Sequence, residues 1–424
     1  MAYIQEDVKR RHQLHSDYQG DFNEDDDYEK EKKMRRTFVF PFTRFSIKGI
    51  VLWIIGLAGI SFLVKLIVYS QKVNHCKRDN MRRLEDIHSE RIEHLQSMCE
   101  KHGLYDSNNN VNRVELAELL VNNEHKLIIR PVQQIGSSFW KSILVILDGI
   151  YTDKSPFDIK NTATASSYSF VRLTDYPTEE ANRMLREYTT VMFTRDPLSR
   201  IYSAYQDLFA SINMRYWKTF GANIINLVRE DAHERSKKCG HDVTFEEFIK
   251  YITDVRFEPY NEDAHWSPVV QQTHPCQIHY DVIGKVETFI DDIHYVLCKI
   301  GASNKVDIPE DSKERLYMAI EKTLRSQVGE DLEVHKCIPK KFIIDKLLKS
   351  IVDKGYVPAM PLINHAWSRG SIARLLKNVL YRVDDEVVKN SMERKLKEAY
   401  EGIPPYLLDK LKFVYEHDFE LFGY

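Results

Sequence analysis

The stretch Tyr188-Thr-Thr-Val-Met-Phe-Thr-Arg-Asp-Pro-Leu-Ser-Arg-Ile-Tyr-Ser-Ala-Tyr205 decides the fold of this chain. Its first part, residues 188–194, is apolar and rich in β-branched residues, a pattern that predicts a buried strand. After Pro197 the apolar residues recur at helical spacing, and proline is favoured at the first helical position. A strand that passes into a helix through a short polar turn is the building unit of an α/β fold.

The turn between this strand and this helix gathers groups that suit an anion. Arg195 ends the strand, and Arg200 and Ser203 follow on the first helical turns. Guanidinium groups, a hydroxyl and the free amides of a helix start are good partners for a phosphate dianion. The alternative is an ordinary strand-to-helix corner in which Arg195 and Asp196 form a solvated pair.

The motif Arg-Asp-Pro-x-x-Arg-x-x-Ser-x-Tyr at 195–205 resembles the 3′-phosphate-binding motif of Golgi carbohydrate sulfotransferases. It is most similar to the chondroitin, dermatan and N-acetylgalactosamine 4-O-sulfotransferases. The resemblance implies that 3′-phosphoadenosine 5′-phosphosulfate (PAPS) is the sulfuryl donor. It also implies that Arg195 and Ser203 hold the 3′-phosphate, with Asp196 and Arg200 beside them.

Two further strand candidates frame this unit. Residues 126–132 read as a strand, followed by a loop at 133–138 and a helix at 139–147, and residues 280–284 read as another strand followed by a helix. Strands that alternate with helices predict a parallel sheet covered on both faces. We therefore expect an α/β fold with a P-loop-like parallel sheet flanked by helices.

The loop after the first strand lacks the Gly-x-x-x-x-Gly-Lys-Ser/Thr pattern, which excludes a P-loop triphosphatase. Aligned on Trp140-Lys141, it resembles the family loop Pro-Lys-Val-Ala/Gly-Cys-Thr/Ser-Asn-Trp-Lys, which binds the 5′-phosphosulfate. The resemblance implies that the donor-binding loop is made of Gln133, Gln134, Ile135, Gly136, Ser137, Ser138 and Phe139.

Gln134 occupies the position of the family lysine, which neutralises charge on the oxygen that the sulfuryl group leaves. A glutamine can donate a hydrogen bond but carries no charge, and losing such a stabiliser costs roughly two to three orders of magnitude in rate. We predict that Gln134 and Lys141 take part in catalysis, with Arg130 as another source of charge. The alternative is a catalytically weak or inactive relative that binds nucleotide or glycan.

Asp263-Ala-His-Trp-Ser-Pro268 and the segment 273–288 also resemble the family. An acceptor hydroxyl needs a base within hydrogen-bond reach, and histidine suits neutral pH. We predict His265 as this base; the alternative is a structural histidine packed beside Trp266. The six cysteines form no Cys-x-x-Cys or zinc pattern, and the chemistry requires no metal, so none is expected.

Residues 46–69 are apolar over a length that matches a bilayer core, which predicts a transmembrane signal-anchor; the alternative is a buried core helix. The basic residues on its two flanks balance, so orientation follows from the resemblance alone. It implies a single-pass type II protein of the Golgi membrane, with a disordered cytosolic tail at 1–45 and a lumenal catalytic domain. Six cysteines after the span permit disulfides there, although the chain has no Asn-x-Ser/Thr sequon.

Residues 70–122 have a charged helical pattern that predicts a stem, either a solvated helix or one that forms a homodimer. The resemblance implies that residues 123–424 form the sulfotransferase-like domain, with a helical insertion at 310–395. The net charge of −3 gives no basic field for nucleic acid. A glycan acceptor is the partner that the resemblance implies. A structural single-span membrane protein with no affinity for 3′,5′-bisphosphates is a further alternative.

Overall fold

The computed structural model describes residues 76–105, 116–152, 154–159, 169–257, 262–327, 336–339, 342–357 and 369–424. All of them belong to one compact unit that runs from Ser70 to Tyr424. The predicted tail at 1–45 and the predicted span at 46–69 lie outside the described residues. Among the described helices, none combines the length and the apolar character that crossing a bilayer demands.

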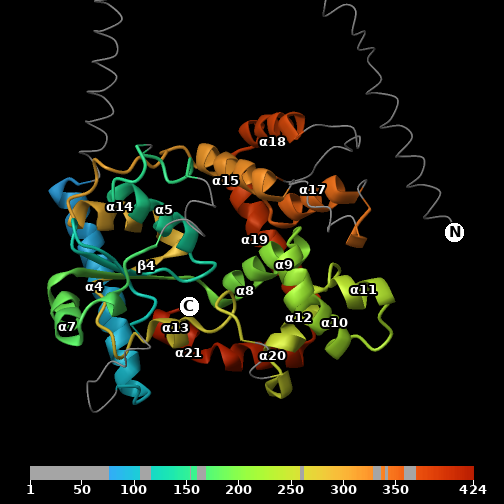
Figure 1. The fold of residues 1–424 in the computed structure, drawn as a ribbon, viewed down its shortest axis with the longest axis horizontal. Coiled ribbons are helices and arrows are strands. Elements are labelled where there is room, and N and C mark those ends of the chain that lie inside the picture. Colours follow the sequence, from blue (N-terminus) through green and yellow to red (C-terminus); the bar gives the residue numbers. More distant parts are fainter. Residues whose placement is uncertain are drawn as a thin grey trace, which may run out of the picture. The chain divides into compact units, whose positions relative to one another are not determined.

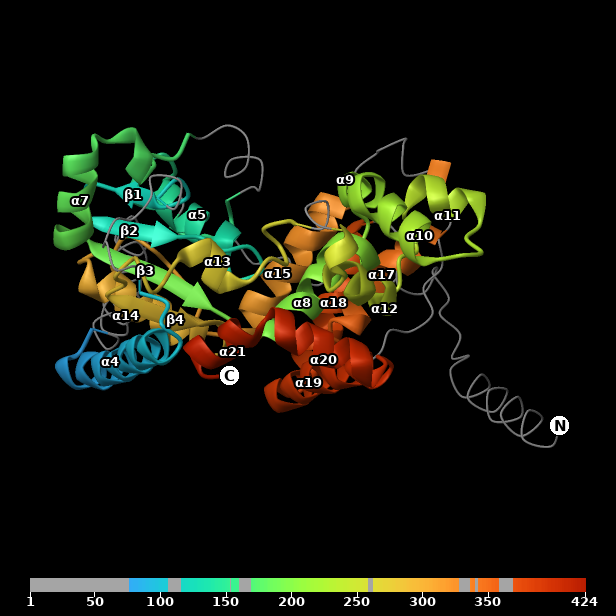
Figure 2. The same ribbon diagram turned by 90° about the horizontal axis from the view of Figure 1, so that it is seen from below.

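The described residues form a four-stranded sheet in the order β1-β2-β3-β4 (Figure 2). The predicted strands correspond to β2 (Leu127–Arg130), β3 (Thr189–Thr194) and β4 (Val282–Lys285), which pair in parallel. Their residues are almost all buried, as expected of strands that are covered on both faces. Figure 1 shows α5 and α14 on one side of this sheet and α13 and α21 on the other.

The prediction of an all-parallel sheet was wrong at one edge. β1 (Leu120–Asn122) runs antiparallel to β2 and pairs Val121 with Ile128. Only residues 123–126 separate the two strands, and such a short turn permits a hairpin but not the crossover that a parallel pair needs. The sheet is therefore mixed.

The helices around the sheet share one hydrophobic core with it. They are α4 (Arg78–Lys101), α5 (Ser137–Leu147), α7 (Thr178–Glu187), α13 (Val269–Thr273), α14 (Phe289–Lys299) and α21 (Glu416–Phe422). Short 3₁₀ turns are η1 (Leu173–Asp175), η4 (Val255–Phe257) and η5 (Val286–Thr288).

The helix expected in the stem is α4, and it packs into the core instead of standing apart. Leu84 and Leu95 of its apolar stripe are buried against the sheet domain. His88 and Arg91 both contact the carbonyl oxygen of Ile283, at 3.1 and 2.9 Å, and so cover the open edge of β4. The stripe that we considered for self-association is thus used within the chain.

A second, helical group follows the Arg195–Tyr205 motif and has its own core. It comprises α8 (Pro197–Tyr205), α9 (Met214–Tyr216), α10 (Ala222–Val228), α11 (Glu234–Cys239), α12 (Phe245–Ile252) and α20 (Pro405–Val414), with π-helical turns η2 (Gln206–Ala210) and η3 (Trp217–Gly221).

A third core lies within the predicted insertion. Its helices are α15 (Ser312–Gln327), α17 (Ile343–Asp353), α18 (Arg369–Arg382) and α19 (Asp385–Glu401).

All six cysteines are paired. The disulfides join Cys76 to Cys298, Cys99 to Cys276, and Cys239 to Cys337. The first two fasten α4 to the sheet domain. The expectation that the cysteines form disulfides is therefore confirmed.

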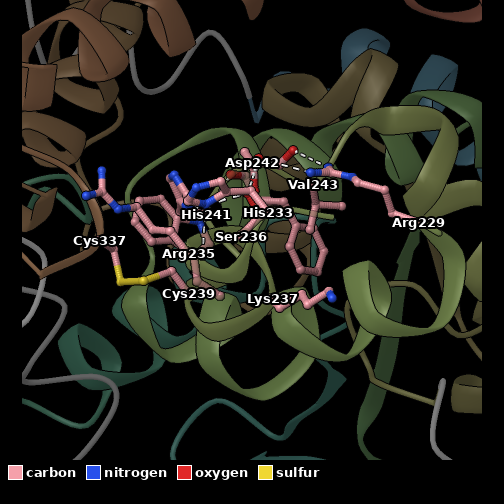
Figure 3. A network of polar contacts seen from close by, with 12 residues as sticks. Arg229, His233, Arg235, Ser236, Lys237, Cys239, His241, Asp242, Val243 and Cys337 are labelled. Atoms are coloured by element: carbon pink, nitrogen blue, oxygen red, sulfur yellow. Dashed lines mark hydrogen bonds and ion pairs between the residues drawn. A yellow bond between two sulfur atoms is a disulfide. The ribbon is translucent and has the colours of Figure 1, made fainter. Parts of the chain in front are cut away.

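The third disulfide attaches the insertion to α11, beside a polar network (Figure 3). Arg229 donates to Asp242 at 3.0 Å and to Glu247 at 2.6 Å, and Ser236 donates to Asp242 at 2.8 Å. Lys346 of α17 donates to the carbonyl oxygen of His241 at 3.1 Å. A disulfide and a half-buried lysine thus attach the insertion to α11 and to the turn that follows it.

Candidate active site

The turn between β3 and α8 is shaped by Asp196. Its carboxylate accepts a hydrogen bond from the amide of Ser199 at 2.7 Å, so it caps α8, and Pro197 fills the first helical position. The amide of Asp196 donates to the carboxylate of Glu287 at 3.1 Å. These contacts give Asp196 a role in shaping the turn, and its contact with a ligand stays a prediction.

Arg195 links this turn to the loop after β2. Its Nη1 donates to the carbonyl oxygen of Gln134 at 3.1 Å. Burial lowers the pKa of the guanidinium below its ordinary value, although nearby Tyr356 and Glu287 raise it. Arg195 and Ser203 line one cavity of about 430 Å³.

Ser203 reaches the same loop residue from the next turn of α8. Its hydroxyl donates to the side-chain oxygen of Gln134 at 2.9 Å. Gln134 adopts the left-handed backbone region, with φ of 64°. The structure therefore brings together the two predicted donor-binding segments, the loop at 133–139 and the turn at 195–203.

Arg200 has a different position from its neighbours. Its side chain is 1% exposed, and its three nitrogens donate to the carbonyl oxygens of Gln133, Ser267 and Ala264 at 3.2, 2.7 and 2.9 Å. These bonds fasten the loop after β2 to the segment that carries His265. Arg200 thus holds two segments of the candidate site together through their backbone. Its contact with the donor stays a prediction.

The loop after β2 needs a glycine at position 136. Gly136 has a φ of 77°, and a Cβ there would lie 2.4 Å from the ring of Phe289. This residue is also the N-cap of α5 and supplies no side-chain cap. The first amides of α5 therefore remain available to an anion, as at other helix N-termini.

The other loop residues support this turn. Ser137 donates to the side chain of Gln133 at 2.8 Å, and Ser138 accepts a bond from Ser142 through its carbonyl oxygen at 3.0 Å. Ile135 is buried, and the ring of Phe139 packs edge-on against Phe289.

A second cavity, of about 580 Å³, lies on the Gln133 side of the loop. Arg130, Lys141 and Arg172 line it together with Glu118, so its lining carries more positive than negative charge. Burial lowers the pKa values of both Arg130 and Lys141. Lys141 and Gln133 thus line one cavity, whereas Arg195 and Ser203 line the other.

His265 forms a polar triad with Asp263 and Tyr216. The carboxylate of Asp263 lies 2.6 Å from Nδ1 of His265, and the hydroxyl of Tyr216 lies 2.8 Å from the same nitrogen. Burial raises the pKa of Asp263, but the hydrogen bonds from His265 and Tyr216 outweigh it, so the pKa is lowered. An ionised Asp263 orients the ring and leaves Nε2 as the nitrogen that can accept a proton.

The residue before this histidine belongs to the second cavity, whereas His265 itself does not line it. The adjacent residue, Ala264, lines that cavity, and the carbonyl oxygen of Ala264 also accepts a bond from the buried Arg200. Trp266, next in the chain, is buried against aromatic neighbours, as the structural alternative expected of this segment. The catalytic role of His265 stays a prediction.

The predicted insertion contributes side chains that the sequence did not single out. Lys354, Tyr356 and Lys389 line the cavity that contains Arg195 and Ser203. Lys354 donates to Asp207 at 2.6 Å, which fixes it beside η2. No local motif marks these residues, because they follow no strand and only tertiary packing brings them to the site.

Tyr424 is another residue that the sequence did not indicate. Its hydroxyl lies 3.0 Å from the hydroxyl of Thr194 and donates to Glu287 at 3.2 Å. Lys285 lies over the Tyr424 ring at 4.2 Å. The chain end therefore packs against the turn that presents Arg195.

Comparison with known proteins shows which family the chain resembles. A sequence profile described as "Sulfotransferase family" matches residues 117–349. Carbohydrate sulfotransferase 14 of Danio rerio is 32% identical over 293 residues, which cover 67% of this chain and 76% of that protein.

Two further relatives carry similar names. Carbohydrate sulfotransferase 11 of Rattus norvegicus is 35% identical over 203 residues, or 47% of this chain and 57% of the relative. Carbohydrate sulfotransferase 9 of Homo sapiens is 32% identical over 233 residues, or 55% of this chain and 52% of the relative. The chain therefore spans little more than half the length of these two proteins. No solved structure matches the chain.

Proposed function

Because the chain belongs to the carbohydrate sulfotransferase family, we propose that it moves a sulfuryl group from PAPS to a sugar hydroxyl of a glycosaminoglycan or glycoprotein glycan. One observation carries this proposal: Arg195 and Ser203 both bond to Gln134, so the two anion-binding segments meet at one residue. A donor with phosphates at its 3′ and 5′ positions needs two such segments side by side.

The nucleotide end of the donor fits the cavity of Arg195 and Ser203. Arg195, Lys354 and Lys389 supply positive charge there, and the open amides at the start of α5 suit the 5′-phosphosulfate. PAPS supplies the activated sulfuryl group. The protein would hold both phosphate ends, and residues of the insertion line the same cavity.

The acceptor fits the second cavity, beside His265. Arg130, Lys141 and Arg172 favour an anionic glycan, and His265 is the base for the attacking hydroxyl. Asp263 holds the ring through Nδ1. Because Gln134 carries no charge, Lys141 or Arg130 of this cavity would have to supply the positive charge that the family lysine gives.

The test is sulfuryl transfer from labelled PAPS by the purified full chain to a panel of desulfated glycosaminoglycans and glycoprotein glycans. We expect transfer to at least one anionic acceptor, and loss of this transfer in Arg195→Ala. Absence of transfer to every acceptor, in a protein that still binds adenosine 3′,5′-bisphosphate, would leave only the second candidate below.

The second candidate is a weak or inactive relative that binds nucleotide or glycan. Its basis is the uncharged Gln134, whose side chain already accepts a bond from Ser203. Binding of adenosine 3′,5′-bisphosphate without turnover is its expected signature. The variant Gln134→Lys separates the two candidates, because activity that appears only in the variant identifies an inactive natural protein.

The cellular setting is part of the same proposal. The apolar segment 46–69 would anchor the chain in the Golgi membrane as a single-pass type II protein, with the catalytic domain in the lumen. Three disulfides favour an oxidising compartment. Protease protection of the region after residue 76 in sealed microsomes would test the orientation, and cross-linking would test the homodimer.

A further inference from the structure

The end of α4 and the helix α21 place three metal-ligating side chains together, away from both cavities. His102 follows α4, and His417 and Glu420 lie three residues apart on one face of α21. One nitrogen or oxygen from each side chain lies within 4.8 Å of the other two. Within the described ranges no other set of three such residues is grouped in this way.

The three atoms share a second property. Nε2 of His102, Nδ1 of His417 and Oε2 of Glu420 are buried from solvent, and outside this group none of them has a hydrogen-bond partner. Buried polar atoms normally have hydrogen-bond partners, so a group of three such atoms with none outside the group requires an explanation. A bound cation would satisfy all three.

A simple ion pair does not account for this group. Nε2 of His102 lies 2.6 Å from Oε2 of Glu420, and a protonated His102 would pair with that carboxylate. Such a pair leaves Nδ1 of His417 without a partner. The other carboxylate oxygen, Oε1, faces Lys101 at 3.6 Å, so Oε2 is the oxygen on the side of His102.

We propose that His102, His417 and Glu420 bind one zinc ion, with water as the fourth ligand. Two imidazole nitrogens and one carboxylate oxygen form a donor set that zinc takes in tetrahedral sites. At metal–ligand distances of about 2.0–2.2 Å the donor atoms lie about 3.3 Å apart. Small side-chain rotations reach this from the present spacing.

Other contacts hold α4 and α21 together around the three ligands. His94 lies 2.8 Å from the carbonyl oxygen of Glu420 through its Nε2, which fixes α21 against α4. The disulfide of Cys99 holds the end of α4 three residues before His102. The metal would therefore complete a joint between α4 and α21, and α21 leads directly to Tyr424 beside the donor turn.

No local motif marks this site, because His417 lies 315 positions after His102 in the chain. The expectation of no metal rested on cysteine spacing and on the needs of sulfuryl transfer. Neither reason applies to a structural ion that joins α4 to α21, because such an ion needs no cysteine ligand and takes no part in the reaction.

The experiment is a zinc titration of the full chain, purified without a histidine tag and stripped with a chelator, against a chromophoric competitor. We expect one tight equivalent of zinc, and a rise in Tm of about 5 °C at a 100-fold excess over Kd. In His417→Ala and Glu420→Gln the affinity should fall at least about tenfold. His279→Ala, which removes a histidine that is 64% exposed elsewhere, is the matched control.

Cobalt absorption gives a readout of the ligands themselves. Tetrahedral d–d bands in the natural protein, lost in both variants but kept in the control, would support the site. Glu420→Gln keeps the side-chain volume, so it serves if His417→Ala does not fold. A natural protein that binds no zinc, or variants that bind zinc as it does, would overturn the proposal whatever the outcome for sulfuryl transfer.

Discussion

The hydroxyl of Ser203 donates to the side-chain oxygen of Gln134 at 2.9 Å, so a residue of the predicted 3′-phosphate motif bonds the residue that aligns with the family lysine. In this arrangement the serine hydroxyl is held toward the loop. A donor that binds Ser203 through its 3′-phosphate must compete with the glutamine. The pair therefore couples phosphate binding to the position of Gln134.

Replacing Gln134 by lysine restores a positive charge next to the leaving oxygen. We expect kcat to rise by roughly 10²–10³, the usual worth of one such stabiliser. The backbone tolerates the change, since glutamine and lysine face the same constraint at φ of 64°. Single-turnover rates with labelled PAPS measure it, with Gln133→Lys as the control on the opposite side of the loop. An unchanged rate would show that Lys141 or Arg130 already supplies the charge.

Replacing Arg195 by lysine removes the planar fork while it keeps the charge. We expect affinity for adenosine 3′,5′-bisphosphate to fall about ten- to a hundredfold, equivalent to roughly 1.5–3 kcal/mol. Ser203→Ala should cost less, since it removes one neutral donor. Calorimetric titration measures both variants.

Thermal melts distinguish a ligand role from a structural one at this position. Arg195 also donates to the backbone of Gln134, so a small loss of stability is expected without ligand. If the ligand stabilises Arg195→Lys as much as the natural protein, the assignment to the 3′-phosphate is wrong.

Replacing His265 by alanine removes the predicted base. We expect kcat to fall by about 10²–10⁴, with little change in nucleotide affinity. Asp263→Asn should also lower kcat, because an amide no longer fixes the ring tautomer that leaves Nε2 free. Tyr216→Phe, which keeps the aromatic packing, is the milder control. An equal loss of nucleotide affinity in all three variants would favour the structural alternative for His265.

Lys346 gives a prediction for pH dependence. Burial lowers its pKa to about 8, against an ordinary value of 10.5. Between these values the unfolded chain binds more protons at this group than the folded chain, so the free energy of unfolding rises with pH. The rise should reach roughly 3 kcal/mol across the window, since each unit is worth 1.36 kcal/mol.

Denaturant titrations between pH 7.5 and 10 measure this rise, because they cover most of the range between the folded pKa of about 8 and the ordinary value of 10.5 for Lys346. The stability of the natural protein relative to Lys346→Met should increase with pH by about 1 kcal/mol per unit. Lys349→Met, on the same helix but 73% exposed, should show no such trend. A flat difference for Lys346→Met would mean that the ammonium is not destabilised by its burial.

Local patterns in the sequence identified the elements of the fold whose burial shows in a few neighbouring residues. Strands β2, β3 and β4 were predicted from short apolar runs such as Val191-Met-Phe193, because buried parallel strands are apolar on both faces. The strand β1 was missed because Leu120–Asn122 has only three residues, too few to show a period. The disulfide partners likewise depend on contacts over long sequence distances.

The residues of the candidate site also fall into two groups, those that a local motif predicts and those that only tertiary packing brings together. Arg195, Ser203 and the loop at 133–139 could be found because each motif is contiguous, and the structure brings them together. The structural position of Arg200 could not be foreseen, since its three carbonyl partners come from two distant segments. Lys354, Tyr356 and Tyr424 reach the site through tertiary packing alone.

The long sequence separations of the disulfides delay their formation during synthesis of the chain. Cys76 must wait for a partner 222 residues further along, and Cys99 for one 177 residues further along. At about 5–20 residues per second, Cys76 remains a free thiol for roughly 10–45 seconds after it is made. During that interval α4 has been made but no disulfide holds it, so its covalent attachment to the sheet domain depends on segments made much later, around Cys276 and Cys298.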